Sequence, residues 1–346
     1  MAKTAVVLFN LGGPDRLQSV RPFLFNLFND PAIIGLPFPI RWMLAQLIAA
    51  RRAPVARQIY AHMGGGSPLL NNTRAQAQAL QETLNRSGAR TYQVFIAMRY
   101  WEPMSREIAA DVKHFDPDRI VLLPLYPQFS ATTTGSSLDA WRRAAKSVSL
   151  EAGTRALCCY PTAPGFIAAI AGKLRPALAD LRASGHNARV LFSAHGLPKR
   201  LVAAGDPYQW QVERTVAAVV SALNVPGLEH VICYQSRVGP LEWLGPSTDE
   251  EIARCGRDRR AAVVVPVAFV SEHSETLVEL DIEYRKLAEE AGVPRYIRVG
   301  TVGNDPAFIE ALATLVQQAE ATGVAICRRP GEAACPDNFR RCPHIG

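Results

Sequence analysis

Residues 261–284 read Ala261-Ala262-Val263-Val264-Val265-Pro266-Val267-Ala268-Phe269-Val270-Ser271-Glu272-His273-Ser274-Glu275-Thr276-Leu277-Val278-Glu279-Leu280-Asp281-Ile282-Glu283-Tyr284. The first nine residues are apolar and rich in Val, which indicates a β-strand. The residues that follow carry four acids spaced three, four and four positions apart: Glu272, Glu275, Glu279 and Glu283. This spacing is typical of one face of a helix. A strand that passes directly into a helix indicates an α/β fold, in which the carboxyl end of the strand faces the crevice that binds ligands.

The row of acids needs a partner of opposite charge. Like charges three or four positions apart on a helix repel each other by a few tenths of a kcal/mol per pair, and no Lys interrupts the row. A divalent first-row metal ion would suit these carboxylates together with His273. The alternative is a solvated helix face that pairs with Arg residues from elsewhere in the chain. The spacing alone leaves both interpretations open.

The alternation of strand and helix extends along the chain. Short β-rich runs predict strands at residues 4–10, 92–97, 119–124, 156–160, 189–194, 230–235, 262–269 and 296–301. Helix-like segments between them include residues 72–87, 104–113, 165–184, 207–223 and 274–291. This pattern predicts parallel sheets with helices on both faces. Because the runs 7–14 and 190–198 enter similar polar turns, we predict two similar domains at 1–160 and 161–310, followed by a helix and a Cys-bearing tail at 311–346.

Length, composition and charge limit the class of protein. A chain of 346 residues with 48% hydrophobic and 20% charged residues suits a two-domain globular protein. The net charge of +7 comes from residues 1–100, which hold eleven Lys and Arg against three Asp and Glu. Such a region suits an anionic membrane surface or an acidic small molecule, whereas the absence of a dense basic run argues against nucleic acid. The first apolar run stops at Asn10, too early for a secretory signal, and no stretch reaches the roughly 18 apolar residues of a membrane span. We expect a cytoplasmic protein with, at most, peripheral contact to the inner face of the membrane.

Residues 31–52 depart from the alternation. They are apolar on nearly every face of their helical part, and Arg41, Arg51, Arg52 and Arg57 accompany them. One interpretation is a buried helix. The other is an exposed apolar lip that holds a flat hydrophobic ligand or rests on a membrane. Basic residues beside an apolar helix suit an anionic interface, which favours the lip.

Polar residues follow other predicted strands as well. His195 stands at the carboxyl end of a strand, where an imidazole with a pKa of about 6.5 could serve as a base or as a metal ligand. A loop His without a role is the alternative. Residues 234–248 are too long and too rich in Gly and Pro for a routine turn, which indicates that they shape a site. The Gly-rich loop 64–68 lacks the ending of a phosphate-binding loop, so nucleotide binding is poorly supported.

Eight motifs, taken in order, resemble those of the ferrochelatase family, whose members insert ferrous iron into a porphyrin. They are Asn10-Leu11-Gly12-Gly13-Pro14, Gly64-Gly65-Gly66-Ser67-Pro68, Met98-Arg99-Tyr100, Leu125-Tyr126-Pro127-Gln128-Phe129-Ser130, Thr133-Thr134-Gly135-Ser136, Ser193-Ala194-His195-Gly196-Leu197-Pro198, Tyr234-Gln235-Ser236-Arg237-Val238-Gly239-Pro240 and His273-Ser274-Glu275-Thr276-Leu277. The resemblance implies two similar Rossmann-like domains of the chelatase type, with the porphyrin between them. It implies an enzyme of the lyase class that converts Fe²⁺ and protoporphyrin IX to protohaem in the last step of haem biosynthesis.

The resemblance also implies roles for individual residues. His195 and Glu275 would be catalytic and would hold the substrate Fe²⁺, with His273 and Glu279 beside them. Four further residues would contact the porphyrin: Leu11, Arg99, Tyr100 and Ser130. The apolar segment 33–49 corresponds to the lip over the active-site mouth, which the family associates with membrane contact.

The seven cysteines argue against a disulfide framework, because their number is odd and the chain has no export signal. Three of them crowd the tail, namely Cys327, Cys335 and Cys342. Animal members of the family carry an iron–sulfur ligand where this chain has Ala131, but some bacterial members join a mid-chain Cys to three in the tail. By that resemblance Cys158, rather than Cys159, would complete a [2Fe–2S] cluster. A zinc site or free thiols in a frayed tail are the alternatives.

Other functions remain to be distinguished from the leading one. The chain could act on coproporphyrin III, or it could insert another metal into another tetrapyrrole. A carrier of porphyrin or haem would need an apolar slot but neither His195 nor the acidic row, so their joint presence favours an enzyme.

Overall fold

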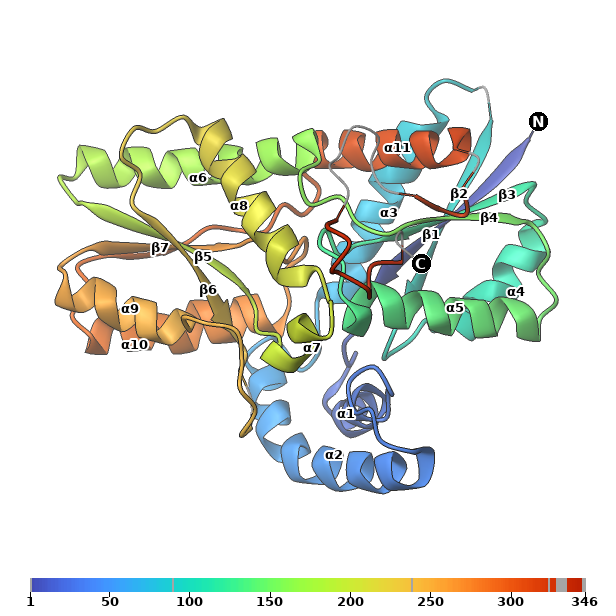
Figure 1. Ribbon diagram of the computed structural model, residues 1–346, viewed down its shortest axis with the longest axis horizontal. Coiled ribbons are helices and arrows are strands. Elements are labelled where there is room, and N and C mark those ends of the chain that lie inside the picture. The colour runs from blue at the N-terminus through green and yellow to red at the C-terminus, as the bar shows by residue number, and fades with distance from the viewer. Residues whose placement is uncertain (1, 89, 238, 323, 328–334, 344–346) are drawn as a thin grey trace.

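The computed structural model describes residues 2–88, 90–237, 239–322, 324–327 and 335–343, with the side chain of Cys327 outside this description. Two parallel sheets lie side by side, flanked by helices (Figure 1). The first has the order β2-β1-β3-β4-β9 and the second the order β6-β5-β7-β8. The predicted fold class of two parallel sheets flanked by helices is therefore confirmed. The predicted domain boundaries stay a prediction.

The strands lie close to where the sequence predicts them. They are β1 (Lys3–Asn10), β2 (Thr91–Met98), β3 (Arg119–Pro124), β4 (Gly153–Leu157), β5 (Ala188–His195), β6 (His230–Gln235), β7 (Ala261–Pro266), β8 (Tyr296–Arg298) and β9 (Ile326–Cys327). The buried strands are rich in Val, Leu and Ile because helices cover both of their faces. The sequence analysis missed β9, which is only two residues long and pairs with the end of β4.

Helices connect the strands. They are α1 (Val20–Phe28), α2 (Phe38–Ala61), α3 (Leu69–Asn85), α4 (Ser105–Phe115), α5 (Ser136–Ser147), α6 (Pro164–Ala183), α7 (Lys199–Ala203), α8 (Tyr208–Leu223), α9 (Thr248–Arg257), α10 (Tyr284–Glu290) and α11 (Pro306–Ala321). A 3₁₀ turn, η1 (Leu17–Ser19), and two π-helices, η2 (Ala131–Gly135) and η3 (Glu275–Glu283), complete the described elements. The segment predicted as one helix over 274–291 is thus η3 followed by α10.

One apolar core joins the two halves of the molecule. It lies on one face of both sheets and includes side chains of α3, α6, α8 and α11. Helices α6 and α11 pack against each other across this core, and Figure 1 shows them along one side of the two sheets. Separate clusters cover the other faces, with α4 and α5 on the first sheet and α9 and α10 on the second.

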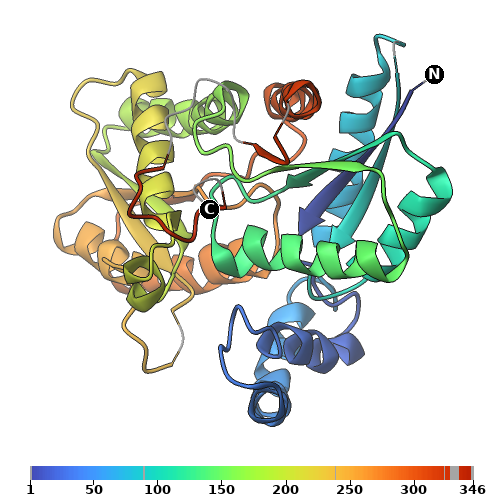
Figure 2. The same ribbon diagram turned by 45° about the vertical axis from the view of Figure 1, so that its right-hand side comes forward.

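Helices α1 and α2 form a lobe that stands away from the sheets in both views (Figures 1 and 2). Three small residues at four-residue spacing, Ala45, Ala49 and Ala53, are the buried face of the central part of α2, and α1 and α2 pack against each other. Large apolar side chains on the lobe are exposed, namely Leu36, Phe38, Ile40, Trp42, Met43, Leu47 and Val55. The interpretation of residues 31–52 as a buried helix is therefore wrong. The segment is exposed, and its role in holding a flat ligand or resting on a membrane stays a prediction.

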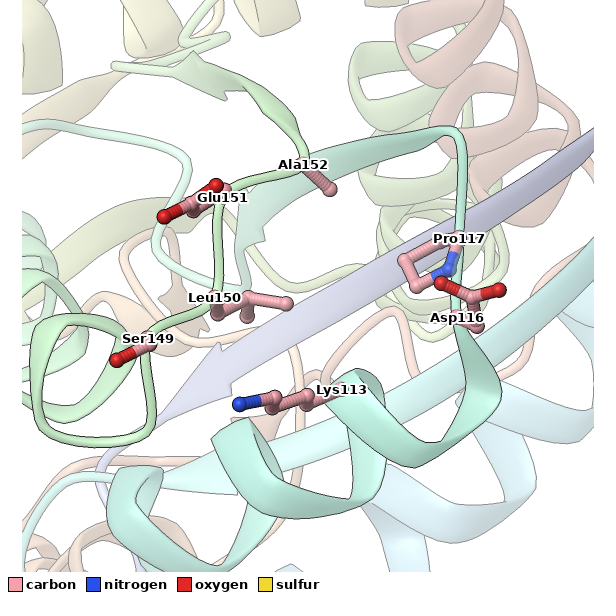
Figure 3. Close-up of a pocket in the computed structure, with 7 residues that line it drawn as sticks. All are labelled: Lys113, Asp116, Pro117, Ser149, Leu150, Glu151 and Ala152. Carbon is pink, nitrogen blue, oxygen red and sulfur yellow. The ribbon is translucent and has the colours of Figure 1, made fainter.

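The predicted site residues do not lie at the hollow in the structure, because the two are at opposite ends of the strands. A hollow of about 350 Å³ lies at the amino ends of β3 and β4 (Figure 3), and it is lined by Lys113, Asp116, Pro117, Ser149, Leu150, Glu151 and Ala152. The predicted site residues Leu11, Arg99 and His195 instead end or directly follow β1, β2 and β5. They therefore lie at the carboxyl ends of the strands, where ligands bind in an α/β fold.

No helix among the described residues is both long enough and apolar enough to span a membrane.

Candidate active site

His195 is the last residue of β5 and pairs with Gln235 at the end of β6. Its Nδ1 lies 2.7 Å from the carbonyl oxygen of Gly196. Because a carbonyl oxygen can only accept, Nδ1 must carry the hydrogen, and Nε2 of the neutral ring keeps its lone pair. That Nε2 lies 3.6 Å from Glu275 Oε1, and 42% of the His195 side chain is exposed. His195 therefore presents an accessible base or metal ligand beside a carboxylate.

Glu275 begins η3 and lies between two imidazoles. Its Oε2 is 3.6 Å from Nε2 of the buried His273, while Oε1 faces His195. Burial alone would raise the pKa of Glu275, but His195 and His273 together lower it to about 2. Glu275 in turn raises the pKa of His273 against the opposing effect of burial. Glu275 is therefore an anion at neutral pH, and its Oε2 has no hydrogen-bond partner among the described residues.

Glu279 lies four residues further along η3 in a different environment. It accepts hydrogen bonds from Ser236 N (2.8 Å), Gln235 Nε2 (3.1 Å) and Tyr284 Oη (3.1 Å). Burial and the neighbouring Glu275 carboxylate nevertheless raise its pKa. Two adjacent carboxyl groups with pKa values shifted in opposite directions are suited to accept and pass on a proton. Ser236 belongs to the long segment 234–248, which was predicted to shape a site.

The remaining acids of the row have separate surroundings. Glu272 accepts hydrogen bonds from Arg298 Nη1 (2.7 Å) and from Thr301 N (2.9 Å). Glu283 is exposed. The interpretation that the acids pair with Arg residues from elsewhere in the chain therefore applies to Glu272, whereas Glu275 is paired with imidazoles.

Arg99 and Tyr100 follow β2 and share one buried carboxylate. Asp30, which follows α1 and is 3% exposed, accepts hydrogen bonds from Arg99 Nη2 and from Tyr100 Oη, each at 2.7 Å, and a short one from Ser136. Tyr100 is wholly buried, and Leu11 packs in the same apolar cluster. These contacts tie the lobe to the carboxyl edge of the first sheet.

The predicted porphyrin contacts of these residues stay predictions. The side chain of Arg99 is 15% exposed and that of Leu11 is half-buried. Ser130 is buried and donates a hydrogen bond to Asp206 at 3.0 Å. This contact joins the turn after β3 to the turn before α8.

Three residues near the site had no sequence signal. Asp30 pairs with Arg99, 69 positions away in the sequence. Arg298 pairs with Glu272, 26 positions away. Tyr60, near the end of α2, is buried close to Ser274 and Glu275, and burial raises its pKa to about 12. Pairings over such separations depend on the fold, so local spacing does not reveal them.

One cysteine of the tail, Cys335, lies near the mid-chain pair Cys158 and Cys159. Cys158 and Cys159 follow β4, are buried, and have their Sγ atoms 3.4 Å apart. The Gln211 amide donates to Cys159 Sγ (3.4 Å) and to Cys335 Sγ (3.3 Å). Cys342 is also buried.

The fourth predicted ligand, Cys327, is described only through its backbone. It pairs with Leu157, the residue before Cys158, and its side chain lies outside the described residues. Cysteine thiolates are the usual ligands of an iron–sulfur cluster. The described residues, which leave out the Cys327 side chain, contain no group of three or more His, Cys, Asp and Glu side chains arranged to hold a metal ion, so the cluster stays a prediction.

Comparisons with known proteins agree with these observations. The ferrochelatase family model matches residues 3–320. A ferrochelatase of Caulobacter vibrioides is 51% identical over 99% of this chain and 97% of its own length, and one of Pelagibacter ubique is 47% identical over 99% and 98%. Among solved structures, SirB from Bacillus subtilis with Fe³⁺ superposes with a TM-score of 0.52 at 16% identity, covering 93% of this chain and 96% of SirB. That likeness supports the fold.

Proposed function

The chain belongs to the ferrochelatase family and acts in haem biosynthesis, and we propose that the porphyrin it receives is protoporphyrin IX. The exposed apolar lobe beside the site favours this porphyrin over coproporphyrin III, because protoporphyrin IX carries fewer charged carboxylates and more apolar edge. The observation that carries the function is the arrangement of His195 and Glu275, in which an imidazole at a strand end has its Nε2 3.6 Å from a carboxylate oxygen.

The chemistry of metal insertion needs these groups. Two pyrrole N–H protons must leave the porphyrin while Fe²⁺ enters. His195 Nε2 can accept a proton, and the Glu275 anion stabilises the imidazolium that results. Glu279, whose raised pKa suits it to hold a proton, lies next along η3. The described residues contain no group of three or more His, Cys, Asp and Glu side chains arranged to hold a metal ion. The pyrrole nitrogens are the final ligands of the iron, so His195 and Glu275 would hold it only in passing.

Anaerobic turnover of Fe²⁺ with protoporphyrin IX and with coproporphyrin III tests the proposal. We expect faster haem formation from protoporphyrin IX. A preference for coproporphyrin III would overturn the choice of substrate, and a faster reaction with Co²⁺ than with Fe²⁺ would favour a different chelatase. Tight porphyrin binding without metal insertion would favour a carrier.

The exposed lobe is expected to bind anionic membranes. Its outer apolar side chains, such as Phe38 and Met43, are 61% and 67% exposed, and Arg residues flank them. We expect the protein to bind vesicles that contain anionic lipid, and the binding to weaken as salt is added. Met43→Ser should reduce the binding measured by vesicle sedimentation. Val324→Ser removes a comparably exposed apolar side chain elsewhere and should leave it unchanged.

Trp42 offers a second measurement on the same lobe. It is 43% exposed and lies against Phe25, with ring centroids 6.2 Å apart. The fluorescence change on adding vesicles should be largely absent in Trp42→Phe. If neither sedimentation nor Trp42 fluorescence responds to vesicles, the lobe does not contact lipid.

We also propose a resident [2Fe–2S] cluster bound by Cys158, Cys327, Cys335 and Cys342. When bound, the cluster would cross-link the tail to the end of β4. Support comes from Cys335, which shares the Gln211 amide with Cys159 and so lies near the Cys158–Cys159 pair, whose Sγ atoms are 3.4 Å apart. The purified protein should be reddish-brown, and Cys335→Ser should lose its visible absorption. Cys233→Ser, at a buried thiol in the second sheet, should keep it.

The same spectra decide between the neighbouring thiols and between the metals. Loss of the cluster in Cys158→Ser but not in Cys159→Ser would support the proposed ligand set, and the reverse would replace Cys158 by Cys159. Colourless wild-type protein with stoichiometric zinc would mean a structural zinc site. Colourless protein without either metal, purified without oxygen, would mean that the tail thiols are free.

A further inference from the structure

Arg298 ends β8 and contacts the acidic segment at two separate places. Its Nη1 lies 2.7 Å from Oε1 of Glu272, three residues before η3 begins. Its Nε donates to Oδ1 of Asp281 at 2.9 Å, and its Nη2 forms a second, short bond to Oδ2. Asp281 is in the last turn of η3. One guanidinium therefore spans the π-helix from the residues before its start to the residues near its end.

The contact is well formed and shielded from water. The side chain of Arg298 is 10% exposed, and those of Glu272 and Asp281 are 27% and 26% exposed. A planar guanidinium can satisfy two carboxylates at once because its donors form a fixed fork, whereas a Lys ammonium is a single compact charge. A second bond from the same strand supports the helix, since Tyr296 Oη donates to the Leu280 carbonyl at 2.7 Å.

A π-helix of nine residues needs such support. Its hydrogen bonds run from i to i+5, a geometry that is rare and mostly limited to single turns. In an α-helix, with 3.6 residues per turn, four residues exceed one turn, whereas in the wider π-helix they fall just short of one. A change of η3 to α-helix would therefore turn Glu279 relative to Glu275, which is fixed between His195 and His273.

We propose that Arg298 is a positioning residue that holds residues 275–283 in the π-helical form and thereby keeps Glu275 and Glu279 in line beside His195. The kinetic part of this proposal rests on the proposed function, whereas the structural part does not. Arg298 touches neither His195 nor Glu275 in the contacts described. Its effect on the reaction would be transmitted through the backbone of η3.

The chain contains a matched control in Arg189. This residue is near the start of β5, its side chain is 5% exposed, and its guanidinium also bridges two carboxylates, Glu229 and Asp258. It lies at the amino edge of the same sheet, away from His195 at the other end of the strand. Arg189→Lys therefore removes a buried guanidinium that bridges two carboxylates, as Arg298→Lys does, but leaves the contacts of η3 unchanged.

The experiment compares Arg298→Lys, Asp281→Asn and Arg189→Lys with the wild-type holoenzyme. Hydrogen exchange of the backbone amides of 275–283 is measured without substrate, and Fe²⁺ insertion is measured with porphyrin affinity determined separately. We expect Arg298→Lys to exchange faster in this segment and to lose about 100-fold in turnover, the loss typical of a misplaced catalytic group, with porphyrin affinity retained. Asp281→Asn, which removes one end of the contact, should change both quantities in the same direction but less. Arg189→Lys should change neither.

Several results would overturn the proposal. One is a folded Arg298→Lys variant with wild-type exchange in 275–283 and wild-type turnover. Another is an equal loss of turnover in Arg189→Lys, which would indicate a general loss of stability. If Arg298→Lys does not fold, Asp281→Asn decides. If the wild-type protein metallates no porphyrin, the proposed function fails, and the exchange measurement alone decides on Arg298.

Discussion

His195→Ala is expected to lower Fe²⁺ insertion by about 10³-fold or more while porphyrin still binds, because a positioned base contributes about 10²–10⁴-fold. Two imidazoles lie 3.6 Å from Glu275, and the side chain of His195 is 42% exposed whereas that of His273 is 10% exposed. The variant therefore removes the more accessible of the two. Anaerobic haem formation followed by absorbance gives the turnover, and quenching of porphyrin fluorescence gives the affinity.

His230 provides the control for this variant. It is the exposed first residue of β6, the strand beside β5, and its Nδ1 also contacts a nearby carbonyl, that of Leu228, at 3.0 Å. His230→Ala should retain wild-type turnover. The assignment of His195 would be wrong if His195→Ala kept near wild-type turnover, or if both variants lost activity equally.

Much of the fold follows from patterns that are local in sequence. Apolar β-rich runs predicted eight strands, and each has its counterpart among β1 to β8. His195 and Glu275 were placed at carboxyl ends of strands, and the structure brings them to 3.6 Å. Such predictions succeed because burial of one face of a strand or helix imposes a periodic spacing of apolar residues, and this spacing can be read from a short stretch of sequence.

The missing parts depend on contacts between distant segments. The spacing of the acids predicts a helix but does not distinguish α from π, because that choice depends on contacts such as the one between Asp281 and Arg298. The role of Asp30 could not be predicted from the sequence, because its partners Arg99 and Tyr100 lie far from it in the chain and reach it only in the folded protein. The strand β9 is too short to have a pattern of its own and exists by pairing with β4.

Glu275→Gln is the second variant with a large expected effect. It keeps the size of the side chain and removes the charge that the two imidazoles hold in place. We expect turnover to fall by about 10²-fold or more, since the neutral amide can neither stabilise a protonated His195 nor bind a metal cation as a carboxylate does.

The charge of the Glu275 carboxylate also affects the stability of the fold. The pKa of Glu275 is about 2 in the folded protein and about 4.3 in an unfolded chain. Ionised Glu275 therefore stabilises the fold above roughly pH 4, and this contribution is lost as the pH falls toward 2. Glu275→Gln should therefore show a weaker loss of stability over that acidic range.

Glu283 separates a role in the site from a general effect of the acidic row. It occupies the same face of η3 two turns further on, but it is exposed, so Glu283→Gln removes an equal charge that water already solvates. We expect this variant to lose little turnover, because a solvated charge at that distance acts weakly on His195. Glu279→Gln should lie between the two, since Glu279 is partly buried and bonded to Ser236. Anaerobic turnover of the three variants, with porphyrin affinity measured for each, gives the order. Equal and mild losses in all three would mean that the row is a solvated helix face, and that the carboxylate between His195 and His273 does not take part in metal insertion.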